Sequence, residues 1–143
     1  MPHLRLEVAE EWLREDFKLA TGFDAKKLLD HLVQVVAGLR MENPEMPFIN
    51  LSNLKHAIVP LHYAHVAGDS SKRFLHLTLS AGNDTPGRTA EVRRRVARTL
   101  GDEVDKFVGD LKGLASVTVH VQDIDRDRGY TTTAERKKPR PAS

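Results

Sequence analysis

The chain has 143 residues, of which 40% are hydrophobic, so it is long enough for one domain with a sizeable core. It contains no cysteine, which excludes disulfides, thiol nucleophiles and zinc–thiolate sites and suits a cytoplasmic protein. No apolar run is as long as a membrane span and no signal peptide is visible, so we expect no membrane contact.

The net charge of +2 is distributed unevenly along the chain. Residues 126–143 contain six basic and two acidic residues, so the remainder of the chain is slightly acidic. Few apolar residues occur near this end, and we therefore predict a basic, disordered tail over residues 123–143 and a folded domain over residues 1–122. A solvated tail of this kind does not by itself indicate nucleic-acid binding, and we expect none.

The first half of the chain predicts a strand, a helix and a second strand. Apolar and polar residues alternate over residues 3–8, which is typical of a half-buried strand. Residues 9–23 are mixed and leave room for a helical turn. A helix is predicted over residues 24–39, because an aspartate that can cap it precedes apolar residues at helical spacing. After a loop with two prolines, a strand is predicted over residues 54–66, at a sheet edge or with a bulge because Pro60 interrupts it.

The second half repeats this order. Leucines alternate over residues 73–80 and predict a strand, and a long helix follows, with Thr85 as its cap, Pro86 at its first position and Gly113 at its end. Alternating valines predict the last strand over residues 116–121. The apolar positions of the predicted helix are Val92, Val96, Leu100, Val104, Val108 and Leu111.

Two β-α-β units, at about residues 1–66 and 73–122, favour parallel pairing within each unit. We predict an α+β fold in which the duplicated units form a four-stranded sheet with two helices on one face. The other face would be uncovered, so the chain is expected to form an oligomer.

Most familiar catalytic motifs are absent from the sequence. None of the seven histidines shows a metal-binding spacing, and we interpret each as an ordinary structural residue. There is no phosphate-binding glycine loop and no nucleophile elbow. We therefore expect neither a metal nor an organic cofactor.

Pro2 is the first candidate for chemistry. If Met1 is removed, Pro2 carries a free secondary amine, and burial and nearby cations lower the pKa of an amine so that it can accept a proton near pH 7. The alternative is a proline that simply begins a strand. Composition alone favours the plain strand start.

Arg88 is the second candidate. The predicted helix places it in the first turn, where the helix dipole disfavours a cation. A cation in an unfavourable position indicates a functional role, because helix amides and a guanidinium together bind carboxylates. The alternative is an exposed arginine on an arginine-rich helix.

Two blocks of the sequence, "MPHLRLEV" and "FLHLTLSAGNDTPGRTAEVRRRV", resemble the tautomerase superfamily, most closely its 5-carboxymethyl-2-hydroxymuconate Δ-isomerases. The likeness covers roughly residues 2–122. It implies a homotrimer in which Pro2 is the acid/base catalyst and Arg88 binds the substrate. A further arginine of the family falls on Lys55, which keeps the charge but lacks the bidentate fork, and Arg40 is an outside candidate for the missing guanidinium.

The resemblance implies a cofactor-independent isomerase of aromatic catabolism that moves a proton within an unsaturated 2-hydroxy or 2-oxo acid with two or three carboxylates. Two alternatives stay open, the first of them because of the lysine at position 55. One is a related hydratase, dehalogenase or phenylpyruvate tautomerase, and the other is a non-catalytic trimeric binding protein. Either enzyme function requires the loss of Met1.

Overall fold

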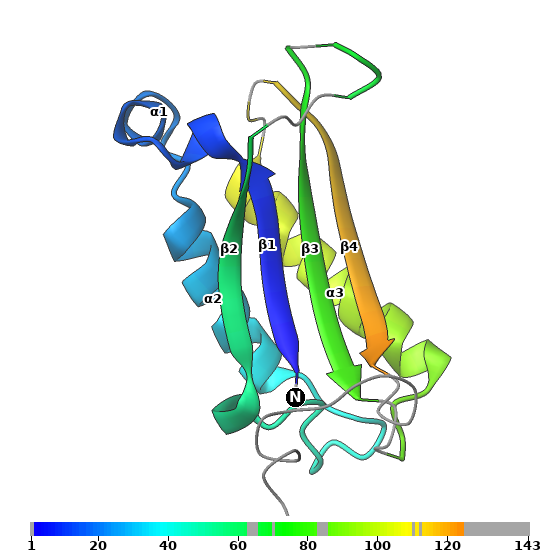
Figure 1. Cartoon of the computed structure of the whole chain (residues 1–143). Coiled ribbons are helices and arrows are strands. Elements are labelled where there is room, and N and C mark those ends of the chain that lie inside the picture. Colours follow the sequence, from blue (N-terminus) through cyan, green and yellow to red (C-terminus); the bar gives the residue numbers. More distant parts are fainter. Residues whose placement is uncertain are drawn as a thin grey trace, which may run out of the picture.

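The computed structural model describes residues 2–62, 66–69, 71–82, 86–109, 111 and 113–124. A four-stranded mixed sheet and helices on one side of it make up this part of the chain (Figure 1). The elements in chain order are β1 (His3–Ala9), the 3-10 turn η1 (Glu10–Leu13), α1 (Glu15–Thr21), α2 (Ala25–Gly38), the 3-10 turn η2 (Leu51–Asn53), β2 (Lys55–Leu61), β3 (Arg73–Gly82), α3 (Ala90–Val108) and β4 (Leu114–Ile124).

The strand order is β2-β1-β3-β4. Strand β1 runs parallel to β2, β3 runs parallel to β4, and the two central strands β1 and β3 are antiparallel. Each half of the chain is therefore one β-α-β unit, and the two units meet along β1 and β3. This confirms the predicted α+β architecture with parallel pairing inside each half.

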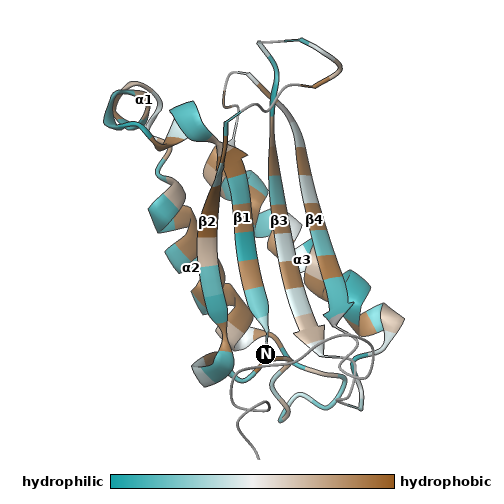
Figure 2. Cartoon of the chain, viewed as in Figure 1, coloured by the Kyte–Doolittle hydropathy of each residue, from teal (hydrophilic) through white to brown (hydrophobic). Residues whose placement is uncertain are grey.

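Helices α2 and α3 lie behind the sheet in Figure 1 and cover the same face. Alternate residues of β1 and β3 point toward them and are buried, and hydrophobic and hydrophilic residues alternate along these strands in Figure 2. The buried side chains of these two strands are Leu4, Leu6, Val8, Leu75, Leu77 and Leu79. The intervening side chains lie on the opposite face, which no helix of the described chain covers.

The N-terminal cap predicted for α2 is confirmed. The side chain of Asp24 accepts hydrogen bonds from the backbone N–H groups of Lys26 and Lys27, at 3.0 and 3.2 Å, and so caps α2. Strand β2 is an edge strand, which is where Pro60 can be accommodated because its missing N–H is not needed for a second neighbour. The strand ends at Leu61, earlier than predicted, and residues 63–65 lie outside the described part.

The predicted boundaries of the long helix are wrong. Helix α3 begins at Ala90, and the hydroxyl of Thr89 caps it by accepting from the N–H of Val92 at 3.2 Å. The helix cannot begin at Pro86 because Gly87 has a φ of +94°, a left-handed conformation outside the helical range. It ends before Gly109 and therefore before Gly113. The predicted cap, Thr85, lies outside the described residues.

The last strand is longer than predicted and continues to Ile124, two residues into the segment assigned to the basic tail. Residues 125–143 lie outside the described residues. The described helices include none that is long and apolar enough to cross a membrane.

Candidate functional site

Pro2 lies at the start of β1, beside the start of β2. Its carbonyl accepts a hydrogen bond from the backbone N–H of Lys55 at 3.0 Å, and the next residue, His3, is the ladder partner of Lys55. Pro2 is half-buried, whereas Lys55 is exposed. The parallel pairing of β1 with β2 thus brings two of the predicted site residues together, although 52 residues separate them in the sequence.

The surroundings of Pro2 are electropositive, as its neighbour His3 shows. Burial lowers the pKa of the His3 imidazole below its usual value, and the positive charges of Lys55, of the chain's amino terminus and of Arg5 lower it further. Lys55 and Arg5 thus place positive charge at the end of β1 that Pro2 precedes.

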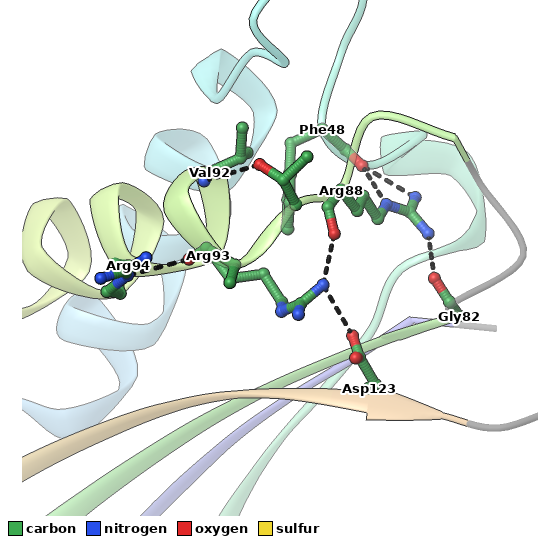
Figure 3. A network of polar contacts seen from close by, with 9 residues as sticks. Phe48, Gly82, Arg88, Val92, Arg93, Arg94 and Asp123 are labelled. Carbon is green, nitrogen blue, oxygen red and sulfur yellow. Dashed lines mark hydrogen bonds and ion pairs between the residues drawn. The ribbon is translucent and has the colours of Figure 1, made fainter.

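Arg88 is held by backbone carbonyls at the same end of the sheet (Figure 3). Its Nε and Nη2 donate to the carbonyl oxygen of Phe48 at 3.0 and 2.8 Å, and its Nη1 donates to that of Gly82 at 2.7 Å. The guanidinium also lies over the Phe48 ring, 5.4 Å from its centroid. Gly82 ends β3, which runs beside β1 toward Pro2, so Arg88 fastens the loop before β2 to the end of a central strand.

Arg88 does not occupy the first turn of α3, so the helix-dipole argument for it was wrong. It precedes the capping residue Thr89, and its carbonyl accepts a hydrogen bond from the guanidinium of Arg93. Arg93 in turn pairs with Asp123 of β4 at 3.4 Å, as Figure 3 shows. The chain ahead of α3 is thereby tied to the sheet through β3 and β4.

Arg40 lies just after α2, and its guanidinium is directed to the end of that helix. Its Nη1 donates to the carbonyls of Ala37 and Leu39, at 2.9 and 3.0 Å. The carbonyl of Arg40 accepts from Nη2 of Arg95, which attaches this segment to α3. In this arrangement the charge of Arg40 stabilises the C-terminal end of a helix.

A hollow of about 570 Å³ lies over the uncovered face of the sheet. Residues of all four strands line it, from His3 and Lys55 near Pro2 to His76 farther along β3. Among the described residues that line it, Glu7 is the one carboxylate, and its Oε2 lies 4.0 Å from Nδ1 of His76. Among the described residues no cluster of three or more potential metal ligands is found.

The backbone contacts of Arg88 and the hollow were not anticipated from the sequence. Both Gly82 and Phe48 offer only carbonyl oxygens, which every residue has, so no sequence signal identified them. The sequence does contain a pattern related to the hollow, because every second residue of several strands is polar. Which of these polar residues lie next to one another became clear only from the strand order and register.

Three solved structures similar to the chain share its fold. A 5-carboxymethyl-2-hydroxymuconate delta-isomerase aligns over 99% of this chain and 96% of its own, with 18% identity and a TM-score of 0.68. A 5-carboxymethyl-2-hydroxymuconate isomerase from Deinococcus radiodurans R1 aligns over 92% and 88%, with 19% identity and a TM-score of 0.59. A fused 4-OT protein described as a symmetric trimer aligns over 95% and 99%, with 15% identity and a TM-score of 0.53.

No protein-family model matches the sequence, and no curated protein matches it. The likeness is therefore one of structure. The chain has the fold of the tautomerase superfamily.

Proposed function

Because the chain has the tautomerase fold, we propose that it is a cofactor-independent isomerase in which the amine of Pro2 moves a proton within an unsaturated 2-hydroxy or 2-oxo carboxylic acid. The observation that carries the proposal is the placement of Pro2 at the start of a central strand, beside Lys55 and in the electropositive surroundings that lower the pKa of His3. An ordinary α-amino group has a pKa of roughly 7.7–8.0, and these cations lower it toward neutrality.

The proposed reaction transfers one proton and needs no other reactant. The neutral amine of Pro2 takes the proton from the enol hydroxyl or from an acidic carbon of the substrate. The electron pair is delocalised over the conjugated system, and the protonated amine returns a proton to a different carbon of that system. Substrate and product are isomers, and the amine ends the cycle in its starting state.

We assign the substrate carboxylates to the cations at this end of the sheet. Lys55 is exposed and adjacent to Pro2, so we propose that it contacts a carboxylate directly and stabilises the developing enolate. Arg88 contributes positive charge to the same end. Its contacts with Phe48 and Gly82 also give it a positioning role, since they fix the loop that leads into β2. A substrate with two or three carboxylates, such as 5-carboxymethyl-2-hydroxymuconate, suits this pair of cations.

We also propose that the chain acts as a homotrimer. The sheet has a face that no helix of the described chain covers, and two neighbours of the same fold, both fused 4-OT proteins, are described as symmetric trimers. Three copies that turn this face toward a common axis would arrange their three sheets around that axis. Sedimentation of the full chain tests the number of subunits, and a monomer at micromolar concentration would contradict this part of the proposal.

The central test is the ketonisation of 2-hydroxymuconate-type substrates, followed by ultraviolet absorbance, in protein whose intact mass shows that Met1 is absent. We expect Pro2→Ala to lower kcat about 100-fold, in line with the loss of a positioned general base. Pro60→Ala is the matched control, because Pro60 is exposed on the edge strand β2, and its kcat should stay unchanged. Equal turnover by Pro2→Ala and the unaltered protein would eliminate Pro2 as the base.

The alternative activities rest on the lysine at position 55, which holds a carboxylate without a bidentate fork. A panel of 5-carboxymethyl-2-hydroxymuconate, phenylenolpyruvate and 3-chloroacrylate separates isomerisation from phenylpyruvate tautomerisation and from dehalogenation. We expect Lys55→Ala to raise KM for the dicarboxylate about tenfold or more, and Lys55→Arg to preserve it. No turnover of any compound by Met-processed protein would favour the non-catalytic binding protein.

A further inference from the structure

The uncovered face of the sheet carries two rows of hydrogen-bond donors, the second of which is continued on β2 by Lys55. In the first row Arg5 of β1 is the ladder partner of Thr78 of β3, which is the partner of His120 of β4. In the second row His3 is paired with Ser80, and Ser80 with Gln122. Partners in a ladder share one face of the sheet, so both rows point into the same hollow, and all six residues line it.

The composition of these rows indicates an anion. Each row contains a hydroxyl and an imidazole, one adds a guanidinium and the other an amide, and neither contains a carboxylate. Glu7, the only acidic residue that lines the hollow, lies in the next row and faces His76.

From these rows we infer that the hollow is a binding site for a small oxyanion of the phosphate class, held by the guanidinium of Arg5 and by the Thr78 and Ser80 hydroxyls between two imidazoles. Neighbouring strands are about 4.8 Å apart, so three strands present their donors across about 10 Å, which matches a phosphate group with its substituent. A guanidinium binds phosphate oxygens in a bidentate manner, and the hydroxyls supply further donors. The hollow of about 570 Å³ is large enough for such a ligand.

This site adjoins the carboxylate site proposed beside Pro2, because His3 is the ladder partner of Lys55 and both residues line the hollow. Arg5 is three residues along the strand from Pro2, a rise of about 10 Å, and His120 lies two strands away from β1. One chain supplies every donor, so the inference does not depend on catalysis by Pro2. If the chain forms a trimer around this face, the assembly contains three such sites.

Calorimetric titration of the full-length protein with inorganic phosphate tests the inference. We expect binding in the unaltered protein and in Pro2→Ala, so a failure of the proposed reaction would leave this result intact. Arg5→Gln should weaken binding about tenfold or more, since it removes charge-assisted hydrogen bonds, and His120→Gln should weaken it less. Arg94→Gln is the matched control, because Arg94 is an exposed arginine of α3 outside the hollow, and its affinity should not change.

A second readout is the proton resonance of the His3 ring. Bound phosphate favours the charged imidazole, so it should raise the pKa of His3, which burial and nearby cations lower in the free protein. The inference is overturned if no heat is detected up to about 10 mM phosphate. It is also overturned if Arg94→Gln weakens binding as much as Arg5→Gln does. Loss of binding in Lys55→Ala but not in Arg5→Gln would place phosphate in the substrate site instead, and tighter binding of malonate than of phosphate would reject the phosphate class.

Discussion

Replacing Arg88 with alanine should destabilise the fold as well as weaken substrate binding. The guanidinium donates to the carbonyls of Phe48 and Gly82, both buried residues. Hydrogen bonds to charged groups contribute about 1.5–3 kcal/mol each, and two carbonyls lose their donor at once. The cation–π contact with Phe48 adds about 0.5–1 kcal/mol. We therefore expect Arg88→Ala to lower the free energy of unfolding by about 3.5–7 kcal/mol, a large part of the stability of a small domain.

Urea unfolding at one fixed protein concentration measures this loss, because the stability of an oligomer depends on concentration. The control is Arg94→Ala. Arg94 is exposed, and its Nε donates to the carbonyl of Ala90 in the same part of α3 at 3.3 Å, so its replacement should change stability by no more than about 0.5 kcal/mol. Arg88→Lys should fall between the two, since an ammonium lacks the fork that serves two carbonyls.

The alternative role gives a different pattern. If Arg88 only bound substrate, Arg88→Ala would raise KM while its urea midpoint matched that of Arg94→Ala. That result would refute the reasoning from the backbone contacts. A lower midpoint together with a higher KM would support both roles.

Four further predictions concern the turn ahead of α3 and the electrostatics near Pro2. Thr89→Ala removes the cap of α3 and should cost about 1 kcal/mol in urea unfolding. Gly87→Ala places a side chain at a φ of +94° and should cost about 1 kcal/mol by the same measurement, although Met41 leaves room for a Cβ. Because the pKa of His3 is lower in the folded chain than in the unfolded one, stability should decline as the pH falls below the ordinary histidine value of 6.5, and His3→Gln should flatten that slope. Lys55→Ala should raise the pKa of His3 in an NMR titration, and an unchanged value would contradict the assigned cause.

The sheet and its two covering helices could be predicted because they depend on local periodicity. Leu4 and Leu6 alternate with polar residues, and the valines of α3 recur at helical spacing, so each element identifies its own buried face. The parallel pairing within each half followed from the β-α-β connections, whereas the order of the four strands was not predicted. The start of α3 could not be predicted in this way, because both Pro86 and Thr89 are acceptable helix-start residues. The backbone of Gly87 decides between them, and its left-handed conformation is not encoded in the periodicity.

The site was predictable only in part, because its residues come from segments that are far apart in the sequence. Pro2 and Lys55 are brought together by the register of β1 with β2, which the sequence left undefined. The sequence suggested a role for Arg88, but from a helical position that it does not occupy. What the structure adds is a contact with two carbonyl oxygens from distant segments. Every residue has a backbone carbonyl, so the sequence cannot indicate which carbonyls accept hydrogen bonds from Arg88.

One property of the surroundings of Pro2 serves both binding and proton transfer. A base that accepts a proton near pH 7 must be neutral there, and the substrate proposed for it is an anion. In the proposed reaction, positive charge from Lys55 and Arg5 would favour the neutral amine and attract the carboxylates at the same time. A carboxylate in either position would raise the pKa of the amine and repel the substrate. The proposal therefore predicts that a change in the charge at position 55 alters the affinity for substrate and the basicity of Pro2 together.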